Sequence, residues 1–212
     1  MNASPKVQNT MSISSNAPQN PSLILASTSK YRRELLERLC IPFEVISPKV
    51  DETPLTGEST LELALRLAHA KAAAVAKEHP NAWVIGSDQV ADLCGAAIGK
   101  PGNFERALAQ LQLMRGATVT FQTALCLMHG DVETTINVPT EVTFRKLPDS
   151  VLESYLLAEE PYDCAGSAKS EGLGISLLES MKSDDPTALI GLPLIALTGL
   201  LRDAGFAIPS KT

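Results

Sequence analysis

Apolar positions fall into short continuous runs and longer helical stripes, which alternate along the chain. A continuous run such as Leu23-Ile24-Leu25-Ala26 is typical of a strand buried on both faces of a sheet. Two longer runs on either side of His129-Gly130-Asp131 are typical of a β-hairpin. Together with a short hairpin around Gly95, this pattern predicts strands at residues 23–26, 43–46, 83–85, 118–128 and 133–144.

Apolar residues spaced three and four apart predict the helices. Ser59-Thr60-Leu61-Glu62 has the sequence of a capping box, and the helix that follows it carries one apolar stripe. Asp185-Pro186 predicts the start of the last helical region, with Asp185 as cap and Pro186 in the first turn. The other predicted helices cover residues 30–39, 104–114 and 148–159. Helices that alternate with strands, plus one long hairpin, indicate a mixed α/β fold with a second lobe.

The first residues of the chain differ in composition from the rest. Residues 1–21 hold one charged side chain, Lys6, and no apolar core. We expect them to form a disordered tail and not a signal peptide, with residues 22–212 as a single domain. The longest nearly apolar run, 188–201, is interrupted by Gly191 and Pro193 and is too short to span a membrane. We therefore expect a cytoplasmic protein without a membrane partner.

Charge narrows the range of partners. The 212 residues include 18 basic and 24 acidic side chains, which gives a formal net charge of −6. This balance argues against binding of polymeric nucleic acid, which requires a basic surface. It does not exclude a nucleotide, because a few well-placed cations can hold one inside an acidic protein.

The four cysteines point to a reducing environment. They form no C-x-x-C pair, and Cys40 and Cys126 lie in apolar runs. We therefore expect free, buried thiols and no disulfide framework. The three histidines have no zinc-ligand spacing to each other or to a cysteine.

A basic segment lies between the first strand and its helix. Ser27-Thr28-Ser29-Lys30-Tyr31-Arg32-Arg33 places cations at a helix N-terminus, where the helix dipole is itself positive. A bound anion would resolve this conflict, with the hydroxyls of Ser27 and Ser29 and the guanidiniums of Arg32 and Arg33 around it. The alternative is a solvated turn in which Arg33 pairs with Glu37.

Two acidic positions are candidates for metal or proton chemistry. Asp88 follows the strand at 83–85, and ligands of open α/β sheets lie beyond the carboxyl ends of strands. Its carboxylate can hold a metal or take a proton from water, or it can simply cap a turn. Asp51-Glu52 follows another strand, so Glu52 is either a ligand of a hard cation or a solvated surface charge.

Two lysines are candidates for phosphate contacts. Lys71 lies beside the apolar stripe of its helix among alanines that leave room for a ligand, although such lysines often extend to water. Lys100 follows Gly95-Ala-Ala-Ile-Gly99, one residue short of a P-loop and with Pro101 in place of Ser or Thr. We reject a P-loop there but keep Lys100 as a phosphate contact.

The last candidate is the glycine-rich stretch from Gly166 to Gly174. Its glycines permit close approach of the backbone, and Glu171 between them can contact the edge of a base. An ordinary flexible loop is the alternative. The chain contains no G-x-S-x-G, H-E-x-x-H or G-x-G-x-x-G motif, so a serine hydrolase, a zinc protease and a dinucleotide enzyme lose support.

Taken in order, these segments resemble the Maf family of nucleotide pyrophosphatases from Leu23 to about Phe206. The segments that carry the resemblance are Leu25-Ala26-Ser27-Thr28-Ser29…Arg32-Arg33, Val50-Asp51-Glu52-Thr53-Pro54, Leu67-Ala68…Lys71-Ala72, Ile85-Gly86-Ser87-Asp88-Gln89-Val90, Gly99-Lys100-Pro101, Cys164-Ala165-Gly166-Ser167…Lys169-Ser170-Glu171-Gly172 and Leu189-Ile190-Gly191-Leu192-Pro193. Gly86-Ser87-Asp88-Gln89 and Ser170-Glu171-Gly172 follow the branch that acts on 7-methyl-GTP. Tyr31 departs from that branch, which often has Trp there.

The resemblance implies a two-lobed sheet flanked by helices, with an active-site cleft between the lobes. It implies metal-dependent hydrolysis of a nucleoside triphosphate to the monophosphate and pyrophosphate, with Mg²⁺, Mn²⁺ or Co²⁺ held between Glu52 and Asp88. By the same resemblance Asp88 is the acid/base residue, and Tyr31, Gln89 and Glu171 set base specificity. A homodimer is also implied.

The charge of the substrate gives this assignment a physical reason. Methylation at N7 makes guanine cationic, so an aromatic ring such as Tyr31 attracts it more than plain guanine, by about 0.5–2 kcal/mol. Three alternatives stay open: a pyrophosphatase for other triphosphates such as dTTP or UTP, a nucleotide-binding regulator of septum formation, and an α/β domain without a phosphate site.

Overall fold

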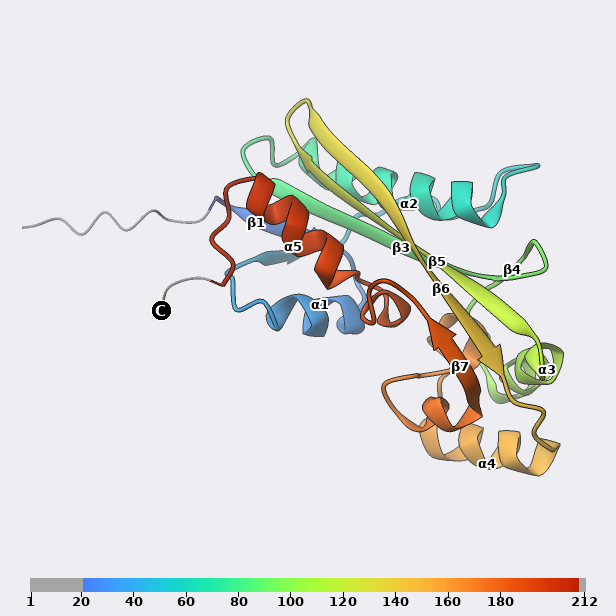
Figure 1. Ribbon diagram of the computed structural model, residues 1–212. Coiled ribbons are helices and arrows are strands. Elements are labelled where there is room, and N and C mark those ends of the chain that lie inside the picture. The colour runs from blue at the N-terminus through green and yellow to red at the C-terminus, as the bar shows by residue number, and fades with distance from the viewer. Residues whose placement is uncertain (1–20, 210–212) are drawn as a thin grey trace, which may run out of the picture.

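Seven strands form one mixed sheet in the described residues, 21–209, of the computed structural model (Figure 1). The strand order is β2-β1-β3-β5-β6-β7, with β4 paired to β3. β1 is parallel to both β2 and β3, and every other pair is antiparallel. The strands are β1 (Leu23–Ala26), β2 (Glu44–Ile46), β3 (Trp83–Leu93), β4 (Ala96–Ile98), β5 (Thr118–His129), β6 (Val132–Phe144) and β7 (Leu178–Lys182).

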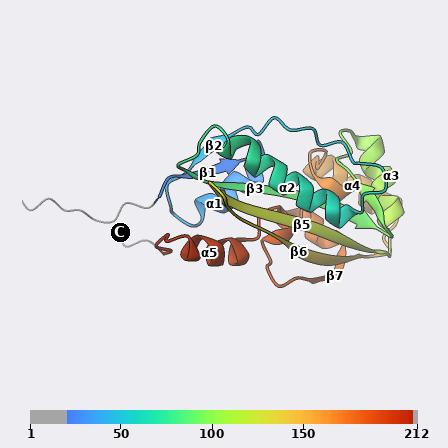
Figure 2. The same cartoon turned by 90° about the horizontal axis from the view of Figure 1, so that it is seen from above.

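Helices cover both faces of this sheet. Seen from above, α2 and α5 lie on opposite sides of it (Figure 2). Side chains of β1 alternate between these sides, since Ile24 packs into the core under α2 and Leu25 into the core under α1 and α5. The helices are α1 (Lys30–Glu37), α2 (Thr60–Ala76), α3 (Phe104–Met114), α4 (Asp149–Glu159) and α5 (Leu194–Asp203). The predicted mixed α/β sheet with flanking helices is confirmed.

A separate core at the other end of the sheet accounts for the predicted second lobe. The far ends of β5 and β6 pack there against α3 and α4, with Phe121 and Phe144 meeting Leu111 and Leu156. The predicted bounds of α3 are confirmed, and Asn103 caps it by accepting a hydrogen bond from the amide of Arg106. The Ser59 capping box and the hairpin of β5 and β6 are also confirmed.

The third strand is much longer than its apolar run predicted. It continues from Ile85 through Gly86-Ser87-Asp88-Gln89 to Leu93, so the predicted end of the strand at residue 85 is wrong. The alternative in which Asp88 caps a turn is wrong for the same reason. Gly86 is needed for close packing and not for a turn, because an added Cβ would lie 2.1 Å from the carbonyl oxygen of Ala68 in α2. Asp88 is therefore a residue in the middle of a strand.

The start of the last helix is also corrected. A short 3₁₀ turn, η3 (Ala188–Ile190), follows Asp185-Pro186, and α5 begins only at Leu194. The buried carboxylate of Asp185 accepts hydrogen bonds from the amides of Thr187 and Ile195. The predicted role of Asp185 as N-cap is therefore wrong, because Pro193 is the N-cap of α5 and Pro186 lies outside the helix. The Asp185 carboxylate nevertheless binds an amide in the first turn of α5, a contact that local sequence patterns do not reveal.

Several smaller predictions can be compared directly. All four cysteines are free, but only Cys126 is buried, while Cys40 and Cys94 are exposed. Cys40 lies between Leu39 and Ile41, which pack into the core, and its own side chain points outward. No helix in residues 21–209 is long and apolar enough to cross a membrane. The predicted tail, 1–21, lies almost entirely outside the described residues.

Candidate functional site

One edge of β3 is open between two of its neighbours. β1 pairs with β3 up to Gly86, and β4 pairs with the same edge from Ala91 onward. Within the described chain, residues 87–90 have no strand partner on that edge. The segment after β1 and the loop after β2 leave the sheet at this end because both strands run parallel to β3. The topology therefore gathers several loops around Asp88.

A buried ion pair lies at this open edge. The Nζ atom of Lys71, from α2, is 2.6 Å from Oδ1 of Asp88, and the two side chains are 6% and 9% exposed. The same Nζ atom is 2.8 Å from Oε1 of Glu52, a side chain that remains 60% exposed. Lys71 therefore joins a buried carboxylate to a solvent-facing one. Its alternative as a lysine that extends to water is wrong.

Arg32, in the first turn of α1, joins Lys71, Asp88 and Glu52 in what we call the charged cluster. Burial lowers the pKa of its guanidinium, and the charges of Asp88 and Glu52 counteract this. Burial raises the pKa of Glu52, but Lys71, Lys100 and Arg32 outweigh it, so the net shift is downward. The Nε atom of Arg32 donates to the carbonyl oxygen of Gly191 at 2.8 Å. This bond fixes the guanidinium where its charge acts on Asp88 and Glu52.

This arrangement suits a polyanionic ligand with a divalent cation. Arg32, Lys71 and Lys100 provide three positive charges beside two carboxylates. The carboxylates of Asp88 and Glu52 contact one ammonium, so they face one another closely enough to share an ion. Mg²⁺ is commonly held by one or two carboxylates together with substrate phosphates, and this donor set fits that pattern. Residues 21–209 contain no group of three or more His, Cys, Asp or Glu that could hold a metal ion.

The two serine hydroxyls just before α1 form hydrogen bonds within the protein. Ser29 is the N-cap and accepts a hydrogen bond from the amide of Arg32, while the hydroxyl of Ser27 accepts one from the amide of Ser29. Arg33 points elsewhere, because its exposed side chain pairs with Glu37 at 2.9 Å. The structure therefore brings Arg32 to the cluster and leaves Arg33 on the surface, as the solvated-turn alternative has it.

The neighbours of Asp88 in the sequence lie on the opposite face of the sheet. Ser87 donates to the carbonyl oxygen of Gly191 at 3.0 Å. The amide nitrogen of Gln89 lies 2.9 Å from the carbonyl oxygens of both Ala188 and Leu189. These bonds hold η3 against β3, so the amide of Gln89 is used within the protein. Its predicted contact with a base stays a prediction.

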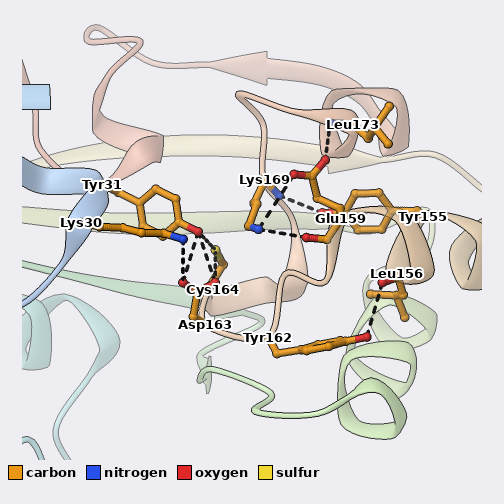
Figure 3. Close-up of polar contacts among 10 residues, drawn as sticks. All are labelled: Lys30, Tyr31, Tyr155, Leu156, Glu159, Tyr162, Asp163, Cys164, Lys169 and Leu173. Atoms are coloured by element: carbon orange, nitrogen blue, oxygen red, sulfur yellow. Dashed lines mark hydrogen bonds and ion pairs between the residues drawn. The ribbon is translucent and has the colours of Figure 1, made fainter. Parts of the chain in front are cut away.

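Tyr31 points away from α1 toward a distant segment. Its hydroxyl donates to the carboxylate of Asp163, with both oxygens at 3.2 Å (Figure 3). Burial, together with the neighbouring Cys164 and Asp163, raises the pKa of this phenol, so the hydroxyl stays protonated as a donor. Lys30 contacts both partners, since its Nζ atom is 4.8 Å from the centre of the Tyr31 ring and 3.8 Å from Oδ2 of Asp163.

The predicted glycine-rich loop is more ordered than an ordinary flexible loop. It forms two 3₁₀ turns, η1 (Ala165–Ser167) and η2 (Leu173–Leu177). Glu159 of α4 accepts a hydrogen bond from the amide of Leu173, and Lys169 donates to the carbonyl oxygen of Glu159 (Figure 3). Glu171 lies on the exposed turn between them. Glu171 and Asp163, the partner of Tyr31, therefore lie in the same connection between α4 and β7.

Asp163 is the residue near the site that sequence patterns did not reveal. It lies 132 positions from Tyr31, in no strand or helix, and no motif includes it. A Tyr–Asp contact at this separation depends on how α1 and the segment after α4 come together. In the sequence, only the neighbouring Cys164, which the resemblance includes, and the glycine-rich stretch from Gly166 pointed to this region.

Comparisons with known proteins agree with this description. A family model described as Maf-like protein matches residues 22–204. A relative from Cupriavidus metallidurans, named 7-methyl-GTP pyrophosphatase, is 63% identical over 88% of this chain and 94% of its own. A second with the same name, from Bordetella avium, is 61% identical over 88% and 95%. The solved structure of the Staphylococcus aureus Ham1 protein covers 59% of this chain and 72% of its own, at 17% identity and a TM-score of 0.42.

The family match spans the whole sheet and every element that supplies the charged cluster. The segments that carry the resemblance, from Leu25 to Pro193, all fall inside it. The expectation from the sequence is thereby confirmed, and this chain belongs to the Maf family.

Proposed function

We propose that this protein hydrolyses the α–β phosphoanhydride of 7-methyl-GTP to the nucleoside monophosphate and pyrophosphate. The observation that carries the proposal is the buried Lys71–Asp88 pair at the open edge of β3, with Glu52 and Arg32 beside it. Relatives more than 60% identical over most of both chains bear the name 7-methyl-GTP pyrophosphatase. Together these findings favour this substrate over dTTP and UTP.

The negative and positive residues of the charged cluster have different roles in the proposed reaction. In the proposed reaction a water oxygen attacks the α-phosphorus, and the bond from that phosphorus to the bridging oxygen breaks. Asp88 orients the water and accepts its proton, since it is the buried carboxylate of the cluster. Arg32, Lys71 and Lys100 stabilise the negative charge that collects on the phosphate oxygens.

A divalent cation, Mg²⁺, Mn²⁺ or Co²⁺, belongs to the same proposal. Asp88 and Glu52 would hold it, because their carboxylates already share the ammonium of Lys71. When bound, such an ion supplies Lewis-acid stabilisation of the phosphate oxygens. Lys71 would then move from the carboxylates to the substrate, which its flexible side chain allows.

The test is a turnover panel. Purified protein with each of the three metal ions is given 7-methyl-GTP, GTP, UTP, dTTP or CTP, and release of pyrophosphate is followed. We expect selective release from 7-methyl-GTP and loss of activity with a chelator. Preference for a pyrimidine nucleotide would retain the reaction and replace the substrate. No release from any of the five would refute hydrolysis and favour a nucleotide-binding regulator.

A further inference from the structure

A cation already occupies an aromatic and acidic site beside the charged cluster. The ammonium of Lys30 lies 4.8 Å from the centre of the Tyr31 ring and 3.8 Å from the carboxylate of Asp163 (Figure 3). An aromatic face and a carboxylate are the two groups that attract a positive charge most directly. The protein therefore contains a cation site that one of its own side chains fills.

The charges around this site favour a cation over a neutral group. Burial raises the pKa of the Cys164 thiol to about 11, so this neighbour stays neutral. Burial opposes ionisation of Asp163, but Cys164, Lys30 and Tyr31 together lower its pKa. Asp163 therefore carries a negative charge at neutral pH, and the hydroxyl of Tyr31 that bonds to it fixes the position of the ring.

The contact with Lys30 is one that a ligand can replace. The side chains of Lys30 and Asp163 are 63% and 52% exposed, and exposed ion pairs contribute little to stability. The lysine offers only a point charge to the ring. A planar cation would add stacking area to the same charge interaction.

The site lies within reach of a nucleotide bound at the cluster. Tyr31 is the neighbour of Arg32 in the first turn of α1, and successive side chains of a helix point in different directions. Arg32 turns toward Gly191, Asp88 and Glu52, while Tyr31 turns toward Asp163. One ligand can therefore place its phosphates by Arg32 and its base by Tyr31.

We propose that Tyr31 and Asp163 select a positively charged base, and that Lys30 holds this position in the free protein until the base displaces it. The inference rests on the proposed function and deepens it, since it names the charge of the base as the selected property. Asp163 is thereby assigned as a specificity residue that recognises charge. Lys30 is assigned as a competitor of the substrate.

The test compares two substitutions with opposite expected effects. Asp163→Asn keeps a hydrogen-bond acceptor for Tyr31 but removes the charge, so the ratio of kcat/KM for 7-methyl-GTP over GTP should fall about two- to fivefold. Lys30→Met removes the competing cation and should raise that ratio by a similar factor. Asp203→Asn and Lys77→Met, at exposed positions of α5 and the end of α2, are the matched controls and should leave the ratio unchanged.

Binding of the nucleoside alone separates this inference from the proposed function. 7-Methylguanosine and guanosine carry no phosphate, so their binding, measured by calorimetry, does not depend on turnover. The wild-type protein should bind the methylated nucleoside more tightly, and Asp163→Asn should lose this difference even if no triphosphate is hydrolysed. Equal losses on both bases in Asp163→Asn would indicate a structural contact between α1 and residue 163, and would overturn the inference. Unchanged ratios in both variants would also overturn it, while leaving selective hydrolysis of 7-methyl-GTP intact.

Discussion

The two faces of β3 use consecutive residues for different purposes. On the face under α2, Asp88 is bound to Lys71 at 2.6 Å, beside an edge of the strand that no other described strand covers. On the opposite face, Ser87 and Gln89 donate to backbone carbonyls of the segment 188–191. In the proposed function the first face presents Asp88 to the substrate, while the other face holds the adjoining loop in position.

The difference between the two faces shows how one strand can carry a site residue and also hold the loop beside it. Side chains alternate between the faces, so residues 87–89 cannot all reach one ligand from the same side. The carbonyl of Gly191 accepts hydrogen bonds from both Ser87 and Arg32. The supporting face therefore also orients a cation of the charged cluster, and the two functions meet at one backbone oxygen.

The largest effect is expected at the chemical face. Asp88→Asn removes the proposed proton acceptor and one proposed metal ligand, so kcat should fall by about 10²–10⁴-fold. Its side-chain oxygen can still accept a hydrogen bond from Lys71, so the protein should stay folded. Steady-state release of pyrophosphate and circular dichroism measure the two properties. A folded variant with more than a tenth of the normal activity would show that Asp88 does not act in proton transfer.

A smaller effect is expected where the two faces meet, at the paired arginines of α1. Arg32→Gln removes a partly buried cation from the cluster and should lower kcat/KM by about 10²–10³-fold. Arg33→Gln is the matched control, because Arg33 is exposed and paired with Glu37, and it should change activity by less than about threefold. Similar losses in the two variants would restore the sequence-based prediction that both arginines bind phosphate.

The smallest effect on activity is expected at the supporting face. Gln89→Leu removes the donor from Thr123, Ala188 and Leu189, and among these acceptors Ala188 keeps another bond, from the Thr123 hydroxyl. The free energy of unfolding should therefore fall by about 1–3 kcal/mol. The ratio of kcat/KM for 7-methyl-GTP over GTP should not change.

The matched control for this position is Gln112→Leu, on the exposed side of α3, which should cost less than about 0.5 kcal/mol. Urea unfolding measures both variants. A changed substrate ratio in Gln89→Leu would assign Gln89 to the recognition of the base, as the resemblance implies.

Local patterns were sufficient for some of the regular elements. The cap at Ser59, the bounds of α3 and the hairpin of β5 and β6 depend on short-range spacing and turn residues, and each agrees with the structure. The long strand β3 did not follow from its pattern, because Gly86 and the polar residues after it read as a turn. Packing against α2, which requires a glycine there, overrides that local preference.

For the candidate site, too, the sequence was sufficient for one part of the description and not for the other. The residues that suit phosphate chemistry, Arg32, Lys71, Asp88 and Glu52 among them, could be named from the sequence because charged side chains beside apolar runs are recognisable there. Which of two adjacent arginines joins the cluster could not be named, because it depends on the direction in which α1 is packed.

The sequence by itself determined the order of the elements from β1 to α4, the capping of α2 and α3 and the supply of charged groups, since these depend on neighbours a few positions apart. The tertiary structure alone decided that Lys71 joins Asp88 to Glu52, that Asp185 binds an amide in the first turn of α5, and that Asp163 meets Tyr31. Contacts of this second kind join segments whose separation in the chain carries no periodic signal. They form only when burial of the cores brings the segments together.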